Sequence, residues 1–93
     1  MSDQENHNYC TGKFIELANE LKNSGYDTKL ISAAMMASSG IYATYISAGN
    51  EGYLEHSGVE KVVDIYRTNL EHIQRRKQDE IKQKQQEQAD FGE

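Results

Sequence analysis

The longest apolar stretch of the chain covers residues 30–49 and contains no charged residue. Its apolar side chains recur three and four residues apart, which places them along one side of an α-helix. They form two adjacent rows, Leu30, Ala34, Ala37, Ile41, Tyr45 and Ala48 beside Ile31, Met35, Tyr42 and Ile46. These rows cover more than half of the helix circumference, so the pattern predicts a central helix that the rest of the chain buries. Asp27 or Thr28 before the stretch and Gly49-Asn50 after it are suitable helix caps.

A second helical pattern precedes the central stretch. Residues 12–24 carry an apolar stripe and a polar opposite face. The stripe contains Phe14, Leu17, Ala18 and Leu21. Ser24-Gly25-Tyr26 then predicts a helix end, with Gly25 in the left-handed conformation.

A third pattern follows the glycine-containing segment 49–52. Ser57-Gly58-Val59-Glu60 has the spacing of a capping box, which predicts a helix from residue 58 or 59. Its stripe is Val59, Val62, Val63, Tyr66, Leu70 and Ile73. Apart from Ile81, the pattern stops after Ile73, and residues 74–93 hold five basic, five acidic and six glutamine residues. We expect this helix to extend past the body of the domain and to fray after residue 82.

These patterns predict an all-α fold of three antiparallel helices at about 12–24, 28–48 and 58–82. The central helix is the buried one and the C-terminal helix is the longest. The expected organisation is a flexible segment at 1–11, a helical domain at 12–82 and a polar, Gln-rich tail at 83–93. A length of 93 residues fits a single domain with a small core.

Charge and composition narrow the possible partners. A net charge of −5 argues against general attraction to nucleic acid or to anionic membranes. The uncharged central stretch is long enough to cross a bilayer, but its serine, threonine and glycine positions make it weakly hydrophobic and no basic cluster flanks it. The first ten residues lack the features of a signal peptide, and the single cysteine, Cys10, fits a reducing compartment. We expect a cytoplasmic protein.

Small residues recur four apart in the central helix, as in the row Gly40, Thr44 and Ala48. Such rows allow the backbone of another helix to approach closely. Two explanations stay open: tight packing within one chain, or a seam between two copies.

Chemical motifs are sparse. His56 and Glu60 are four residues apart, but no further histidine or cysteine is placed to complete a metal site. Arg75-Arg76-Lys77 is the only basic cluster, and neighbouring acidic residues suit ion pairing on a solvated helix. We therefore expect no catalytic residues, no cofactor and no metal.

The aromatic and sulfur-containing residues suggest one alternative. Tyr42 and Tyr45 of the central helix and Tyr66 of the third could converge with Met35 and Met36 into an apolar pocket. The simpler interpretation is that they are core residues whose hydroxyls reach partners or solvent.

Three segments carry a resemblance to a known family. FIELANEL at 14–21, ISAAMMASSGIYATYISA at 31–48 and VVDIYRTNLEHI at 62–73 resemble a family of short proteobacterial proteins classified only as a domain of unknown function. The resemblance covers roughly residues 12–73, and this chain departs from the family in the loop at 49–57 and in its Gln-rich end. It implies a small helical cytoplasmic bacterial protein and assigns no catalytic residue.

The pattern as a whole predicts a non-enzymatic interaction module that acts through helix–helix contacts with itself, as a homodimer, or with a protein partner. The expected contacts are the small-residue face of the central helix and the stripe Tyr66, Leu70 and Ile73. The alternative is a small hydrophobic ligand-binding protein that uses the Tyr/Met pocket. Both the architecture and the interaction hypothesis assume that the uncharged segment is one helix hidden by its neighbours in the chain.

Overall fold

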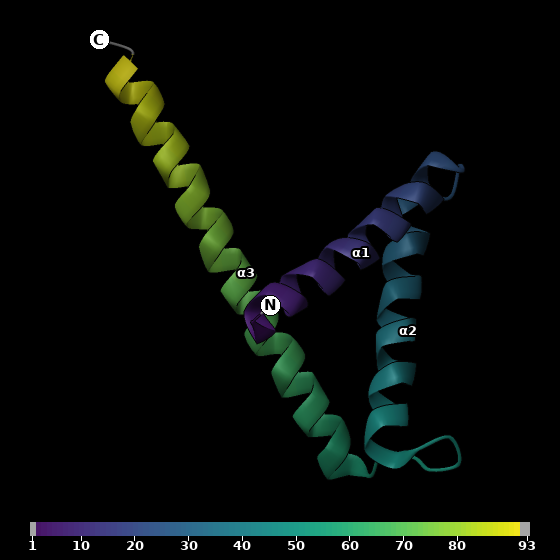
Figure 1. Ribbon diagram of the computed structural model, residues 1–93. Coiled ribbons are helices and arrows are strands. Elements are labelled where there is room, and N and C mark those ends of the chain that lie inside the picture. The colour runs from purple at the N-terminus through teal and green to yellow at the C-terminus, as the bar shows by residue number, and fades with distance from the viewer. Residues whose placement is uncertain (1, 92–93) are drawn as a thin grey trace. The chain divides into compact units, whose positions relative to one another are not determined.

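The computed structural model describes the backbone of residues 2–91 and the side chains of residues 2–89. The described chain consists of three α-helices and their loops: α1 (Asp3–Asn23), α2 (Thr28–Ala48) and α3 (His56–Phe91) (Figure 1). The all-α prediction with three helices is confirmed. The chain divides into two units, Met1–Ile46 and Ser47–Glu93, which are considered one at a time.

Helix α1 begins nine residues earlier than its apolar stripe predicts, at residue 3 where residue 12 was expected. Ser2 is the N-cap, and its Oγ accepts a hydrogen bond from the backbone N–H of Glu5 at 3.1 Å. The Ser2 hydroxyl also donates to the Glu5 carboxylate at 3.2 Å, and Asp3 and Glu5 place negative charge in the first turn. Both features stabilise a helix N-terminus. Residues 3–11 are therefore helical, and the expected start at residue 12 is wrong.

The connection from α1 to α2 follows the predicted capping chemistry. Gly25 has φ of 104°, its N–H donates to the Lys22 carbonyl, and the Tyr26 N–H donates to the Leu21 carbonyl. This pair of bonds is the Schellman motif that commonly ends a helix at glycine. Asp27 then caps α2, because its Oδ1 accepts from the Lys29 N–H at 2.8 Å. The predicted bounds of the central helix, 28–48, are confirmed.

Burial of the central helix is not observed. Helices α1 and α2 diverge from their loop like the arms of a V, so the two helices lie close together only near that loop (Figure 1). Ile31, in the first turn of α2, is the one buried side chain among those described, with 7% exposed. Ile41 and Ile46, further along, are 72% and 68% exposed. The prediction that the other helices cover α2 is wrong, because a diverging neighbour cannot cover its far half.

The loop of the second unit turns tightly. Gly49, with φ of 77°, ends α2 as predicted. A Cβ on Gly52 would collide with the backbone carbonyl oxygen of Ala48, so only glycine fits this turn without a backbone shift.

Helix α3 starts at His56, which lies inside the helix and not before it as expected. The Val59 N–H donates to the Glu55 carbonyl at 3.0 Å, so Glu55 is the flanking residue. The Leu54 side chain folds back over the first turn, where a Cβ on Gly58 would lie 3.3 Å from its Cδ2. The predicted cap at Ser57 is therefore wrong, because the helix begins at His56 and Ser57 lies within its first turn.

The far end of α3 is also longer than expected. The helix continues to Phe91 as one 36-residue rod, where a polar tail was predicted from residue 83. Glutamine, lysine and glutamate are all strong helix formers, and propensity continues the helix after the apolar stripe has ended. At 1.5 Å per residue, α3 is about 54 Å long.

Candidate interaction surfaces

Helix α2 presents the first apolar surface. Met35, Met36, Tyr42 and Tyr45, all predicted contact or pocket residues, are 40%, 58%, 64% and 49% exposed. The rings of Tyr42 and Tyr45 lie 6.1 Å apart between centroids and are tilted by 38°. This is a favourable aromatic pair, and it leaves both rings open to a further contact.

One position of the small-residue row of α2, Gly40, is also open. Nothing lies within 4 Å of the place where a Cβ on Gly40 would stand, apart from the helix's own backbone. The Thr44 hydroxyl donates back to the Gly40 carbonyl at 2.8 Å, as expected for hydroxyls in this helix. Gly40 is therefore open, whereas Thr44 and Ala48 of the same row are half-buried.

Helix α3 presents a narrower apolar surface, which we call the α3 seam. It contains Val59, Val63, Tyr66, Leu70 and Ile73, each 42–49% exposed. The successive spacings are four, three, four and three residues, which is the repeat of the contact positions in a coiled coil. Tyr66, Leu70 and Ile73 are predicted contact residues, and the structure places them on this one stripe.

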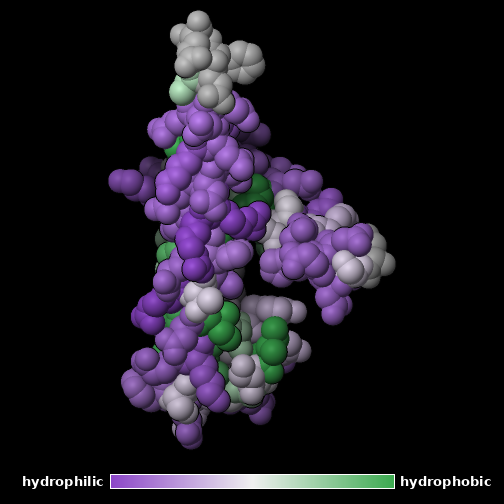
Figure 2. All heavy atoms as spheres, turned by 90° about the vertical axis from the view of Figure 1, so that its left-hand side faces the viewer, coloured by the Kyte–Doolittle hydropathy of each residue, from purple (hydrophilic) through white to green (hydrophobic). Residues whose placement is uncertain are grey.

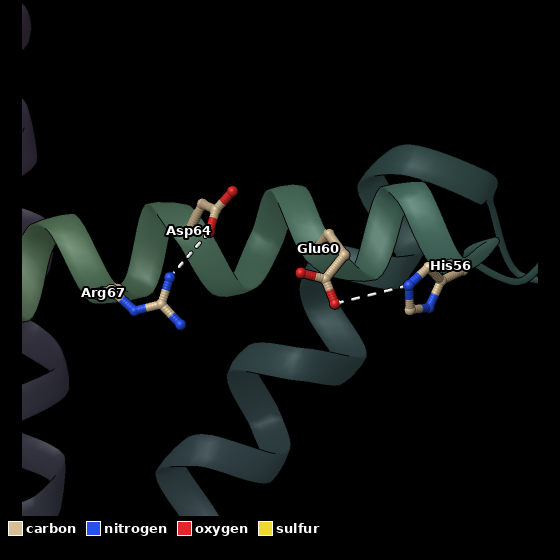
Figure 3. A network of polar contacts seen from close by, with 4 residues as sticks. All are labelled: His56, Glu60, Asp64 and Arg67. Atoms are coloured by element: carbon tan, nitrogen blue, oxygen red, sulfur yellow. Dashed lines mark hydrogen bonds and ion pairs between the residues drawn. The ribbon is translucent and has the colours of Figure 1, made fainter.

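Charged side chains flank the α3 seam (Figure 3). The His56 Nε2 lies 3.8 Å from Glu60, and the Arg67 guanidinium lies 3.0 Å from Asp64. Each pair lies within one helix, and all four side chains are more than half exposed. Exposed pairs of this kind contribute little to stability. Glu60 and Arg67 are not among the predicted contact residues; the signal that identifies them is their position one residue after Val59 and Tyr66.

The C-terminal half of α3 has a different character. Figure 2 shows hydrophilic side chains over most of this part of the helix, and Lys77 pairs with Glu80 at 3.6 Å. This ion pair fits the expected solvated helix around the basic cluster.

The predicted Tyr/Met pocket is not among the two best-formed hollows on the described chain. Both hollows lie on α3, one lined by Asp64, Ile65, Thr68 and Asn69 and the other by Ile73, Arg76, Lys77 and Glu80. Of the seven predicted contact residues, only Ile73 lines either hollow. Met35, Met36, Tyr42 and Tyr45 share one helix, and Tyr66 belongs to the other unit.

Other chemical features are simple. Within residues that the structure describes, no three histidine, cysteine, aspartate or glutamate side chains gather where they would hold a metal ion. Cys10 is an exposed free thiol on α1. No helix in the described range is both long enough and apolar enough to cross a membrane.

Comparison with known proteins adds no relative. No family model, no curated protein and no solved structure matches this chain. The resemblance to short proteobacterial proteins over residues 12–73 therefore stays a prediction.

Proposed function

We propose that this protein is a non-enzymatic interaction module that acts through helix–helix contacts with another protein chain. The supporting observation is the exposure of its apolar residues along α2 and along the α3 seam. One described side chain, Ile31, is buried, whereas Ile41 and Ile46 of α2 are more than two-thirds exposed. Continuous exposed apolar surface marks interaction sites in soluble proteins.

The physical basis differs from the one that the sequence suggested. The sequence-based hypothesis assumed that α2 is hidden by its own chain, and that assumption is wrong. A chain of this size buries only a small apolar core by itself. An apolar helix face that it leaves exposed is therefore available for contact with another chain. We infer that the apolar faces of α2 and α3 pack against antiparallel helices of another chain.

Contact with another chain should couple folding to concentration. If a second copy supplies the cover, the midpoint of thermal unfolding rises with protein concentration. The test is circular dichroism at 222 nm during heating, at about 2 µM and about 200 µM, together with light scattering on the same samples. A shift of several degrees with a growing mass supports the proposal.

Two other outcomes are informative. A monomer that loses helicity gradually on heating at both concentrations supports cover from a different protein. The third outcome is a monomer that unfolds cooperatively at a midpoint that does not depend on concentration. Its apolar faces would then be buried within one chain, and that result overturns the proposal.

A further inference from the structure

We propose that α3 pairs with α3 of a second copy of this chain in antiparallel orientation, along the α3 seam. This inference rests on the proposed function and specifies its partner. The seam is the only stripe of five apolar residues with an unbroken four–three repeat in the described part of α3. Such a repeat allows the side chains of two helices to interlock.

The seam defines the layers of the pair. In one antiparallel register, Val59 lies opposite Leu70 of the second copy and Val63 lies opposite Tyr66. The two-fold axis repeats both layers, which makes four apolar layers in all. His56 and Ile73 then face each other at both ends of the seam.

The charges beside the seam select this register. Antiparallel helices bring residues on the same flank of the two stripes together. On one flank, Glu60 lies opposite Arg67 of the second copy, twice by symmetry. On the other flank, Glu55 lies opposite Arg76 of the second copy, also twice. All four flanking ion pairs are attractive.

Shifted antiparallel registers do not share this complementarity. A shift by seven residues in one direction places Arg67 opposite Arg67, and a shift in the other direction places Glu60 opposite Glu60. Like charges in such flanking positions oppose association and direct helices towards other alignments.

A parallel pair is also disfavoured. It would place Glu55 beside Glu60 of the second copy, and it would align Lys77 with Lys77 and Glu80 with Glu80. Lys77 and Glu80 continue the four–three repeat past Ile73, so in a parallel pair these like charges would meet within the seam.

The flanking groups are free to exchange partners. Among the described residues, Glu60 and Arg67 form exposed pairs within α3, to His56 at 3.8 Å and to Asp64 at 3.0 Å (Figure 3). Such pairs contribute little, so pairing across the seam replaces weak contacts.

The test is charge reversal in the full chain, with Cys10→Ser in every variant to prevent disulfide-linked dimers. The variants are Glu60→Arg, Arg67→Glu and the double reversal. The control is Lys61→Glu, which makes the same charge change as Arg67→Glu but lies on the side of α3 away from the seam. Sedimentation equilibrium at 0.1 M salt gives the association constant of each.

Each single reversal turns two attractive pairs into two repulsive ones, and we expect association to weaken about tenfold. The double reversal restores opposite charges across the seam and returns the constant to within about threefold of the parent, while the control stays within about twofold. An equimolar mixture of the two single variants associates as the parent does, because every cross-pair is then attractive.

Rescue by the double reversal cannot come from a new pair within one helix. Positions 60 and 67 lie two turns apart, and the carboxylate introduced at position 67 stands near the like charges of Asp64 and Glu71. A double variant as weak as the single ones overturns the antiparallel seam. So does a parent chain that stays monomeric, which would assign the surface to a different protein. Neither result overturns the interaction module itself, which fails only if the monomer unfolds cooperatively at a concentration-independent midpoint.

Discussion

Helices α2 and α3 leave apolar surface exposed in two different ways. Helix α2 is apolar on most sides and carries no charge after Lys29, so nothing beside its exposed residues distinguishes one partner alignment from another. Helix α3 gathers five of its apolar residues into one stripe, with Ile65 and Ile81 outside it, and charges of both signs lie beside that stripe. Burial stabilises a contact in either case, but only α3 carries the charge pattern that selects a partner's direction and register.

The largest expected effect is on the α3 seam. Leu70→Asp places a charge in the two apolar layers where Leu70 faces Val59 and should weaken self-association about a hundredfold, because a buried unpaired charge is very unfavourable. Ile65→Asp is the matched control, since Ile65 is 63% exposed and lies off the seam. Its effect should stay within about threefold by sedimentation equilibrium. Equal losses from both variants would mean that α3 has no preferred face.

The next effect separates the two ends of α2. Ile31→Ala should lower the free energy of unfolding by about 2 kcal/mol, because Ile31 is buried near the loop. Ile41→Ala should cost less than about 0.5 kcal/mol, because the Ile41 side chain is largely solvated. Urea unfolding at low micromolar concentration, followed by circular dichroism, measures both. Equal costs in the dilute chain would contradict the exposure of α2.

A smaller effect tests the small-residue row of α2. Gly40→Ala should stabilise a free helix by about 1 kcal/mol, since alanine is the better helix former and the added Cβ meets no atom. Gly12→Ala on α1 is the control, because its surroundings are equally open. Thermal unfolding should show a gain for both. A loss at Gly40 alone would show that another backbone lies against α2 in solution.

The smallest effect is a dependence on salt. Raising the salt concentration from 0.1 M to 1 M shortens the screening length from about 10 Å to about 3 Å. Self-association through the flanked α3 seam should weaken about threefold. The Glu60→Arg variant should respond less than the parent, because its two repulsive pairs offset the two Glu55–Arg76 attractions that remain. A contact through uncharged α2 would show neither response in light scattering.

The predictable parts of the fold are those set by local chemistry. Three helices, the bounds of the central one and the left-handed Gly25 follow from periodicity and capping residues. The start of α1 differs from the prediction because the Ser2–Glu5 cap lies well before the first residue of the apolar stripe, Phe14, from which the helix was predicted. The distant end of α3 was missed because helix propensity continues where apolar periodicity stops.

Burial was not predictable in the same way. The apolar rows of α2 indicate which side chains need cover, but they do not say which chain supplies it. Whether α1 buries the apolar rows of α2 depends on the angle between the two helices, and no single residue determines that angle. Along α3 the apolar stripe was predictable. The proposed pairing of Glu60 with Arg67 becomes visible only when each residue is numbered relative to the four–three repeat.

The length of α3 has a mechanical consequence for an antiparallel pair. The helix extends 18 residues past Ile73, a stiff projection of about 27 Å. In the register described above, the two projections point away from each other, and their ends stand roughly 80 Å apart. Such an assembly would hold the two Phe91 positions at a set separation.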